Sequence, residues 1–253
     1  MKTSTLIARS LLAGLGFFAH VAQAVELKVL SGNGSRPAVI ALTKQFEQAT
    51  GHKVTVDFFV NPDVKKKIEA GEYFDVTVLN PPVLDDLIKQ GKVAANSRAV
   101  IGRIGLGAAI KSGAPKPDIS TVEGFKKTML SINSVAYPGD GASGIYFVSL
   151  LDRMGIGAEM KPKLRPMSGE YNVEVVATGT VDMVVVVASR IYGVPGVDML
   201  GLIPKELQTW IGFATGVNPQ SKHAEAAKAL TKFLSTPPAD AVLKPIGIEP
   251  FVE

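Results

Sequence analysis

Apolar and polar positions alternate along most of this chain with two periods, one of two residues and one of three to four. Residues 25–30 (VELKVL) place charged side chains between apolar ones, as a strand does. Residues 35–50 repeat apolar side chains at helical spacing, and Gly51 stands where that helix should end. This pattern predicts an alternation of short strands and longer helices.

The same alternation continues to the end of the chain. Further strands are predicted at 54–59, 75–79, 103–110, 134–137, 182–187 and 210–217. Further helices are predicted at 63–70, 82–90, 120–130, 142–154, 169–177 and 221–234, with a short one after Pro238. Strand, helix and strand in this order predict parallel sheets covered by helices. A loop rich in Gly, Pro and Lys at 111–117 separates two such series, so we expect two α/β lobes. The order of the elements is compatible with insertion of the second lobe into the first.

The residues before Val25 follow a different pattern. Lys2 and Arg9 precede an apolar run at 11–19, and small residues occupy the A-x-A positions that end at Ala24. This order is typical of a secretory signal peptide. The alternative, a transmembrane anchor, needs roughly 20 apolar residues, which this run does not reach. We therefore predict that residues 1–24 are removed by cleavage after Ala24 and that the mature protein is periplasmic.

Composition narrows the function classes. The chain has 46% hydrophobic and 20% charged residues, which is typical of a globular protein with a sizeable core. It contains no cysteine, so thiolate metal sites and thiol catalysis are excluded. Its net charge of +4 includes Lys2 and Arg9 of the predicted signal peptide, and the remainder gives no electrostatic footprint for nucleic acid.

Two glycine-containing loops lie where ligands bind in α/β sheets, between the carboxyl end of a strand and the start of a helix. The first, at 31–35, offers the hydroxyls of Ser31 and Ser35 beside flexible backbone, and an ordinary serine-capped turn is the alternative. The second, at 137–144, matches G-x-G-x-x-G, but the basic, proline-broken stretch 160–166 stands where a dinucleotide-binding acid should be. We expect its helix N-terminus to bind an anion rather than a nucleotide.

Groups suited to catalysis are few in the sequence. His52 and His223 are the only histidines beyond the signal peptide, so neither a serine triad nor a histidine metal cluster is predicted. The leading prediction therefore includes no catalytic residue, no metal and no cofactor. A valine-rich strand at 184–187 leads directly to Ser189 and Arg190, which we expect to contribute to an anion site.

Several segments together resemble one protein family. They are the leader, the opening VELKVLSGNGS, the stretches QFEQATGHKVTVDF, KKKIEAGEYFDVTVL and GDGASGIY, and the closing NPQSKHAEAAKALTKFLSTPPA. In this order, and over nearly the whole mature chain, the sequence is similar to the periplasmic molybdate-type solute-binding proteins of ABC importers. The resemblance implies a small anionic ligand and an ABC permease as membrane partner. We expect a monomer, because nothing in the sequence suggests an oligomer interface.

The resemblance also implies a two-lobed periplasmic binding protein fold of type II, in which each lobe is a mostly parallel α/β sheet flanked by helices. Two hinge strands cross between the lobes, and on that pattern the crossings lie near 107–110 and 212–216. Lobe 1 is then expected to comprise 25–108 and 213–253, and lobe 2 to comprise 109–212. The anion is expected in the cleft between the lobes, which close over it.

Ligand contacts carried over from the family fall on identifiable residues of this chain. They are Asn33, Gly34 and Ser35 at the first helix start, Asn61 at the next, Ser143 and Gly144 at the second-lobe helix start, and Gly169. Asn61 replaces a hydroxyl residue of the family, and Val187 replaces a tyrosine that donates its hydroxyl. Each missing donor costs about 1 to 3 kcal/mol, so these changes predict weakened binding of molybdate. An organic polycarboxylate held by amides and an arginine is an alternative ligand.

An enzymatic activity is the alternative to binding alone. The segments GAPKPDIS, ASGIY and VPGVDMLGLIP resemble an aconitate isomerase branch, whose members shift a proton within aconitate without a cofactor. This reaction needs a base, for which Asp140, Tyr146, Glu170 and Tyr192 are candidates. The leading interpretation is a binding protein that closes around an anion, and the alternative is this isomerase.

Overall fold

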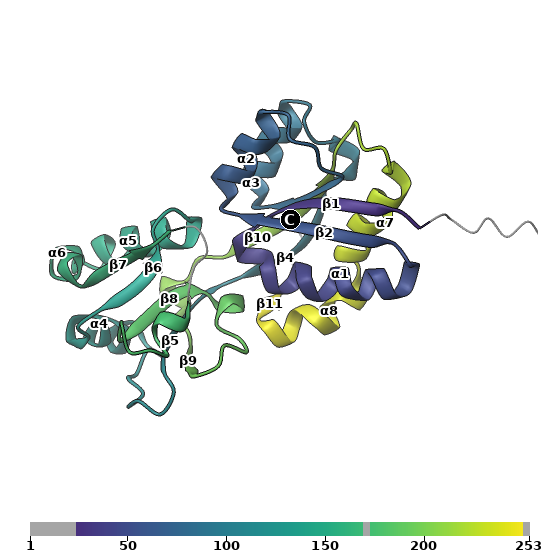
Figure 1. Cartoon of the computed structure of the whole chain (residues 1–253). Helices are drawn as coiled ribbons and strands as arrows, with labels where there is room; N and C mark the ends of the chain where they lie inside the picture. The colour runs from purple at the N-terminus through teal and green to yellow at the C-terminus, as the bar shows by residue number, and fades with distance from the viewer. Residues whose placement is uncertain (1–23, 169–172, 250–253) are drawn as a thin grey trace, which may run out of the picture.

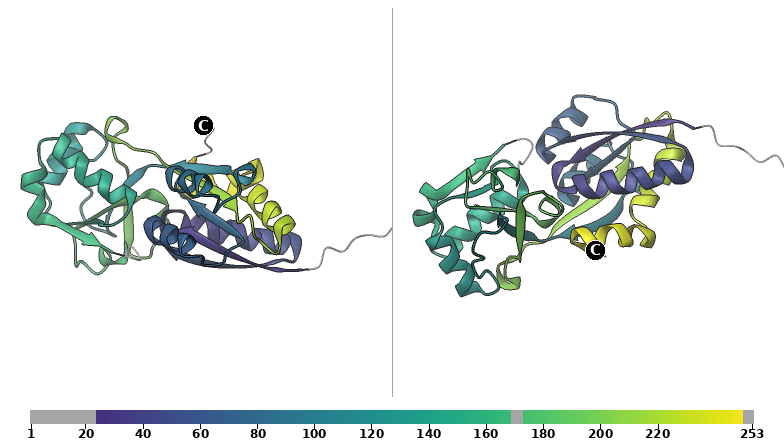
Figure 2. Two further views of the ribbon diagram at one scale, coloured as in Figure 1. Left: turned by 90° about the horizontal axis from the view of Figure 1, so that it is seen from above. Right: turned by 60° about the horizontal axis from the view of Figure 1, so that its bottom comes forward.

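The protein consists of two α/β lobes. The structure is a computed structural model that describes residues 24–168 and 173–249. Figure 1 shows the lobes side by side, and the two further views in Figure 2 show the same separation. Of the predicted signal peptide, only Ala24 falls within these ranges. No helix among the described residues is long and apolar enough to cross a membrane.

The first lobe is built on a six-stranded sheet with the order β11-β4-β10-β3-β1-β2. Its strands are β1 (Glu26–Gly32), β2 (Lys53–Phe59), β3 (Val76–Leu79), β4 (Ala99–Ile104), β10 (Ile211–Val217) and β11 (Ile248–Glu249). Its helices are α1 (Arg36–Thr50), α2 (Asn61–Glu69), α3 (Pro81–Lys89), α7 (Ala224–Leu234) and α8 (Pro237–Leu243). Helices α2 and α3 pack together on one face of the sheet, and α1, α7 and α8 cover the other (Figure 1).

The second lobe is built on a five-stranded sheet with the order β7-β6-β8-β5-β9. Its strands are β5 (Leu106–Lys111), β6 (Val135–Pro138), β7 (Leu164–Met167), β8 (Met183–Val187) and β9 (Val197–Leu202). Its helices are α4 (Val122–Ser131), α5 (Ala142–Arg153) and the short α6 (Gly157–Met160). All of β8 is buried, because it lies between β6 and β5, and this explains its continuous run of valines.

The apolar stripe of helix α1 packs into the core of the first lobe. Val39, Leu42 and Phe46 are each about 1% exposed, whereas Ile40 on another side of the helix is 51% exposed. Fully burying side chains of this size stabilises the fold by about 1.5–3 kcal/mol each. Gly51 ends the helix with a φ of 75°, a left-handed conformation that glycine adopts readily, as predicted.

Both sheets are mixed rather than mostly parallel. Strand β1 pairs in parallel with β2 and β3, and β6 pairs in parallel with β7 and β8. Antiparallel pairs join β10 to β3 and β4, β11 to β4, and β5 to β8 and β9. The four strands that flank the two passages between the lobes, β4, β5, β9 and β10, all form antiparallel pairs. The predicted parallel pattern therefore holds for the part of each sheet away from the crossings.

The first passage between the lobes is at Gly105. The strand predicted at 103–110 is in fact two strands, because β4 belongs to the first sheet and β5 to the second. A Cβ atom at Gly105 would lie 2.8 Å from Nε2 of Gln208, so a larger residue there would displace the Gln208 amide. The crossing thus precedes the predicted position, 107–110.

The second passage is the segment 203–210, which joins β9 to β10; the predicted crossing at 212–216 lies inside β10. Gln208 ties the two passages together. Its Oε1 accepts the N–H of Leu106 at 2.7 Å, and its Nε2 donates to the carbonyl of Leu106 at 3.0 Å. Leu106, which also pairs with Val187 of β8, is thereby bonded to the second passage. The lobe boundaries at 108/109 and 212/213 stay predictions, and the changes of sheet lie a few residues before each of them.

The second lobe contains strands that the pattern did not predict. Strand β7 lies at an edge of the sheet, where Pro166 is tolerated because an edge residue needs no ladder donor on its outer side. Strand β9 forms the other edge and contains Gly201. The helix predicted at 169–177 falls partly outside the described residues, and within them 173–175 form one 3₁₀ turn rather than an α-helix.

A buried carboxylate fastens the end of lobe 1 that lies away from lobe 2. Asp75, directly before β3, is 1% exposed. Its oxygens accept the N–H of Lys28 at 2.9 Å and the hydroxyls of Tyr73 at 2.7 Å and Ser221 at 2.6 Å. Burial of the phenol, followed by its hydrogen bond to Asp75, raises the pKa of Tyr73. The carboxylate thereby joins β1, β3 and the turn before α7.

We predict that Asp75→Ala destabilises the protein by about 2–4 kcal/mol, because partly buried donors lose a charged acceptor. Urea unfolding of the chain from Val25 measures the change. Asp182→Ala is the matched control. Asp182 accepts the N–H groups of Asn133 and Ser134 at 3.0 and 3.1 Å, but it is exposed, so water can accept these N–H groups in the variant. Equal losses in the two variants would contradict the role assigned to Asp75.

Candidate functional site

A small cavity lies between the lobes. Its volume is about 30 Å³, which is room for about two water molecules. Both lobes contribute to its wall, the first lobe in part through the start of β10. The wall is formed by Asn33, Gly34, Val60, Asn61, Asn80, Gly141, Ala142, Ser143, Val187, Ile211 and Phe213. The predicted site residues Asn33, Gly34, Asn61 and Ser143 therefore meet in one place.

Helix N-termini from both lobes converge on this cavity. In the first lobe the 3₁₀ turn η1 (Asn33–Ser35) follows β1 and leads into α1, while α2 begins at Asn61 after β2. In the second lobe α5 begins at Ala142 after β6. Each helix N-terminus carries about half a positive charge and N–H groups without an intrahelical acceptor. A cavity surrounded in this way is suited to an anion.

Helix α5 supplies backbone donors. The N–H groups of Gly144 and Ile145 donate to the carbonyl of Gly141 at 3.1 and 3.0 Å. The preceding N–H groups, of Ala142 and Ser143, have no carbonyl of the same helix within reach. Both residues line the cavity, so these N–H groups and the Ser143 hydroxyl are the donors that the second lobe offers.

Helix α3 contributes a side chain instead of its backbone, because it begins with Pro81 and Pro82, which have no N–H. The residue before them, Asn80, forms an amide pair with Asn61. Nδ2 of Asn61 donates to Oδ1 of Asn80, and the backbone N–H of Asn80 donates to Oδ1 of Asn61 at 3.2 Å. Nδ2 of Asn80 also donates to the carbonyl of Gly212 at 3.3 Å. Each amide nitrogen has a second N–H beyond these bonds, which it can offer to a ligand.

One wall of the cavity is apolar. It consists of Val60, Val187, Ile211 and Phe213. A Cβ atom at Gly34 would lie 3.3 Å from the Phe213 ring, so glycine allows the η1 turn to approach β10 closely. Val187 stands where the family's tyrosine is expected, and it places a methyl group rather than a hydroxyl at the cavity.

The cavity wall contains no acidic or basic side chain. Arg36 and Arg190 lie two and three positions beyond lining residues, and both are half-buried. The guanidinium of Arg36 lies over the ring of Phe58, 4.5 Å from its centroid. Among the described residues no group of three or more His, Asp or Glu side chains could hold a metal ion. Positive character at the cavity therefore comes mainly from helix ends.

Other predicted site residues do not line the cavity. The buried hydroxyls of Ser31 and Ser35 lie 3.0 Å apart, and that of Ser35 donates to the carbonyl of Gly32 at 2.9 Å, so they brace the η1 turn. A Cβ atom at Gly144 would lie 1.5 Å from the carbonyl oxygen of Pro138, which makes this glycine a packing residue.

The remaining predicted residues lie beside the cavity or outside the described residues. Ser189 and Arg190 belong to the 3₁₀ turn η5 (Ala188–Arg190) after β8, and Ser189 bonds to the first lobe. Gly169 lies outside the described residues.

The sequence interpretation missed Asn80. Its signal was available, because Asn80 follows the buried strand β3 and precedes two prolines that start a helix. Strand ends in a parallel sheet meet at one edge, so the residue after β3 belongs beside those after β1 and β2.

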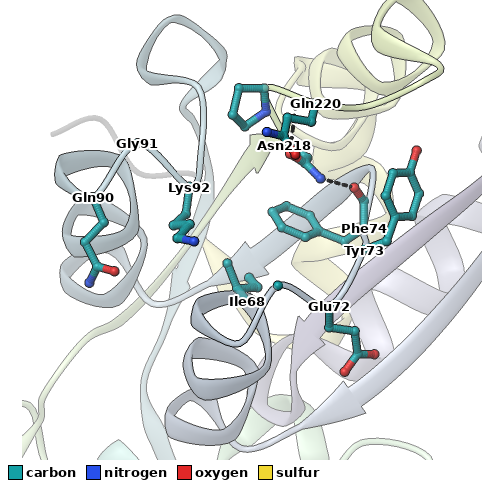
Figure 3. Close-up of a pocket in the computed structure, with 11 residues that line it drawn as sticks. Ile68, Glu72, Tyr73, Phe74, Gln90, Gly91, Lys92, Asn218 and Gln220 are labelled. Carbon is teal, nitrogen blue, oxygen red and sulfur yellow. Dashed lines mark hydrogen bonds between the residues drawn. The ribbon is translucent and has the colours of Figure 1, made fainter.

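A larger pocket, of about 260 Å³, lies at the opposite end of the first lobe (Figure 3). It is lined by Ile68, Gly71, Glu72, Tyr73, Phe74, Gln90, Gly91, Lys92, Asn218, Pro219 and Gln220. The amide of Asn218 donates to the carbonyl of Phe74 at 2.7 Å and closes one side of it (Figure 3). Helices α2 and α3 meet this pocket with their C-terminal ends, which carry partial negative charge and disfavour an anion. The smaller cavity between the lobes is the better anion site.

The family model for bacterial extracellular solute-binding proteins matches residues 27–249, a range that includes both sheets and the whole cavity wall. The chain belongs to this family. Aconitate isomerase of a Pseudomonas species is 33% identical to this solute-binding protein over 232 residues, 88% of this chain and 87% of that protein. Molybdate-binding protein ModA of Azotobacter vinelandii is 28% identical over 246 residues, 92% of this chain and 94% of that protein. Both resemblances seen in the sequence are confirmed.

Solved structures of such proteins share the fold of this solute-binding protein. The periplasmic molybdate-binding protein of Azotobacter vinelandii superimposes with a TM-score of 0.75 at 18% identity, covering 88% of this chain and 98% of that one. The sulfate-binding protein SubI of Mycobacterium tuberculosis superimposes with a TM-score of 0.71 at 18% identity, covering 89% of this chain and 87% of that one. The expected two-lobed periplasmic binding protein fold is thus confirmed.

We predict that Ser143→Pro weakens anion binding about tenfold to a hundredfold, because it removes an N–H that donates to a charged ligand. Isothermal titration calorimetry with the tightest-binding anion measures the effect. Ser143→Ala keeps the N–H and should cost less. Glu123→Pro, at the same second position of α4, controls for a proline at a helix start away from the cavity. Unchanged affinity in Ser143→Pro would show that this loop is only a turn.

Proposed function

We propose that this protein is an exported receptor that captures a small, fully ionised anion in the cavity between its lobes and delivers it to the permease of an ABC importer. The observation that carries the proposal is the convergence of helix N-termini from both lobes on a cavity without carboxylates. The N–H groups at those helix ends only donate, and the side chains of the wall carry no negative charge, so an anionic ligand is favoured. Family membership and the molybdate- and sulfate-binding neighbours support the same reading.

The size and chemistry of the cavity favour a compact oxyanion. A volume of about 30 Å³ is far below the 300–1,000 Å³ typical of pockets for larger organic ligands. An amide at Asn61 and a methyl group at Val187 stand where the family resemblance implies hydroxyl donors, which lowers the expected affinity for molybdate. An organic polycarboxylate requires a wider separation of the lobes, with Arg190 or Arg36 within reach of its carboxylates.

Capture is coupled to closure of the lobes. The first lobe contributes Asn33, Asn61 and Asn80, and the second contributes Ser143. Because the two sets of donors meet in the closed arrangement, an anion that contacts both shifts the population toward it. The predicted leader and the extracellular family support a periplasmic location, and we propose that the receptor acts there as a monomer and presents its closed form to the permease.

We expect at least one anion among molybdate, tungstate, sulfate, citrate and trans-aconitate to raise the melting temperature of the mature protein. A ligand at a hundred times its dissociation constant adds about 2.7 kcal/mol, which corresponds to about 5–10 °C for a chain of this size. Thermal melts followed by circular dichroism measure the shift, and Ser143→Pro should reduce it. No shift with any of the anions would contradict the receptor as proposed.

A second candidate is an aconitate isomerase, favoured by the relative of that name at 33% identity. The position of the candidate bases supports the receptor instead. The Tyr146 hydroxyl donates to the carbonyl of Leu207 at 3.1 Å, and neither Tyr192 nor Asp140 lines the cavity. The remaining candidate, Glu170, lies outside the described residues.

We predict that the purified protein does not convert trans-aconitate to the cis isomer, because no base among the described residues faces the cavity. Proton NMR of the substrate, incubated with the protein and no added cofactor, follows the reaction. Catalytic turnover would replace the receptor by the isomerase. In that case Glu170→Gln and Asp140→Asn would show which carboxylate acts as the base.

A further inference from the structure

One short segment of the second lobe contacts the first lobe beside the cavity. This segment, 187–192, follows β8 and includes the η5 turn. Ser189 is 1% exposed, and its hydroxyl donates to the carbonyl of Gly34 at 3.0 Å. A Cβ atom at Gly34 would also lie 3.9 Å from the Val187 side chain. The backbone of the η1 turn is thus held by the opposite lobe.

The same segment reaches the first lobe at a second point. Tyr192 is 41% exposed, and a Cβ atom at Gly247 would lie 2.9 Å from the edge of its ring. Gly247 directly precedes β11, a strand of the first sheet, and has a φ of 75°. The ring therefore packs on a backbone position that has no side chain.

We propose that residues 187–192 form a latch that holds the lobes closed, with Ser189 as its main positioning residue. Ser189 does not line the cavity, and its hydroxyl is used by Gly34, so it acts on the ligand through the lobe arrangement and not as a donor. Its effect on affinity rests on the proposed function. Its effect on lobe closure does not, because the hydrogen bond joins two parts of the protein.

The latch is tested on the ligand-free protein. Because the chain has no cysteine, Lys66→Cys on α2 and Lys127→Cys on α4 can carry a dye pair, one in each lobe. Single-molecule energy transfer then reports the open and closed populations. We expect Ser189→Ala to raise the ratio of open to closed molecules about twofold to tenfold, the effect of one lost neutral hydrogen bond. Tyr192→Ala should act in the same direction, and the double variant more strongly.

Ser131→Ala is the matched control. The Ser131 hydroxyl also donates to a carbonyl at 3.0 Å, that of Thr128, but within the second lobe, so its loss should leave the populations unchanged. For an anion that binds, its dissociation constant from the Ser189→Ala variant should be higher than from the unchanged protein. The factor should equal the factor by which the closed fraction is lower.

Weaker binding without any change in the ligand-free populations would show that Ser189 touches the ligand directly, and it would overturn the latch. Unchanged populations in both Ser189→Ala and Tyr192→Ala would overturn it as well. If no anion binds, the receptor fails while the population measurement still decides on the latch. Circular dichroism melts establish that each variant is folded.

Discussion

The parallel pairing of β1 with β2 and β3 is the constraint on which the site depends. Its register places Gly32 opposite Phe59 and Ser31 opposite Val78, so the three strands end at the same edge of the sheet. The residues that follow each strand, among them Asn33, Asn61 and Asn80, are therefore neighbours although the chain between them is long. The helices that begin there turn their N-termini to the same point, and the partial positive charge of these ends favours an anion although no charged side chain lines the cavity.

The second lobe joins this arrangement through the hinge. Tyr146 lies one helical turn beyond Ser143 on α5, and its hydroxyl donates to the carbonyl of Leu207 in the second crossing. Next to it, Gln208 holds Leu106 in the first crossing. A ligand at the N-terminus of α5 would therefore act on a helix that is bonded to the second crossing and, through Gln208, connected to the first. This chain of contacts gives a physical route between occupancy of the cavity and the angle of the lobes.

The relatives show how one scaffold serves capture and catalysis. A binding protein needs donors on both sides of a ligand, and here the amide pair lies on one side of the cavity and the start of α5 on the other. An isomerase needs in addition a base aimed at a carbon atom of the substrate, and the described residues at the cavity include none. Fold and family are therefore shared by relatives named for both activities, so neither fold nor family separates binding from catalysis.

The sequence by itself predicted most strands and helices of the first lobe and the Gly51 helix end, because these depend on local periodicity and backbone propensity. It also predicted Ser31, Ser35, Gly144 and Ser189 as ligand contacts, although these residues do not line the cavity. Residue type and position in the sequence do not say in which direction a side chain points.

Tertiary structure alone decided that Ser31 and Ser35 bond inside their own loop and that Gly144 makes room for Pro138. It also decided that Ser189 bonds across the lobes and that the crossings lie at Gly105 and 203–210. These outcomes rest on contacts between segments distant in sequence, such as Gln208 with Leu106, which no local pattern contains.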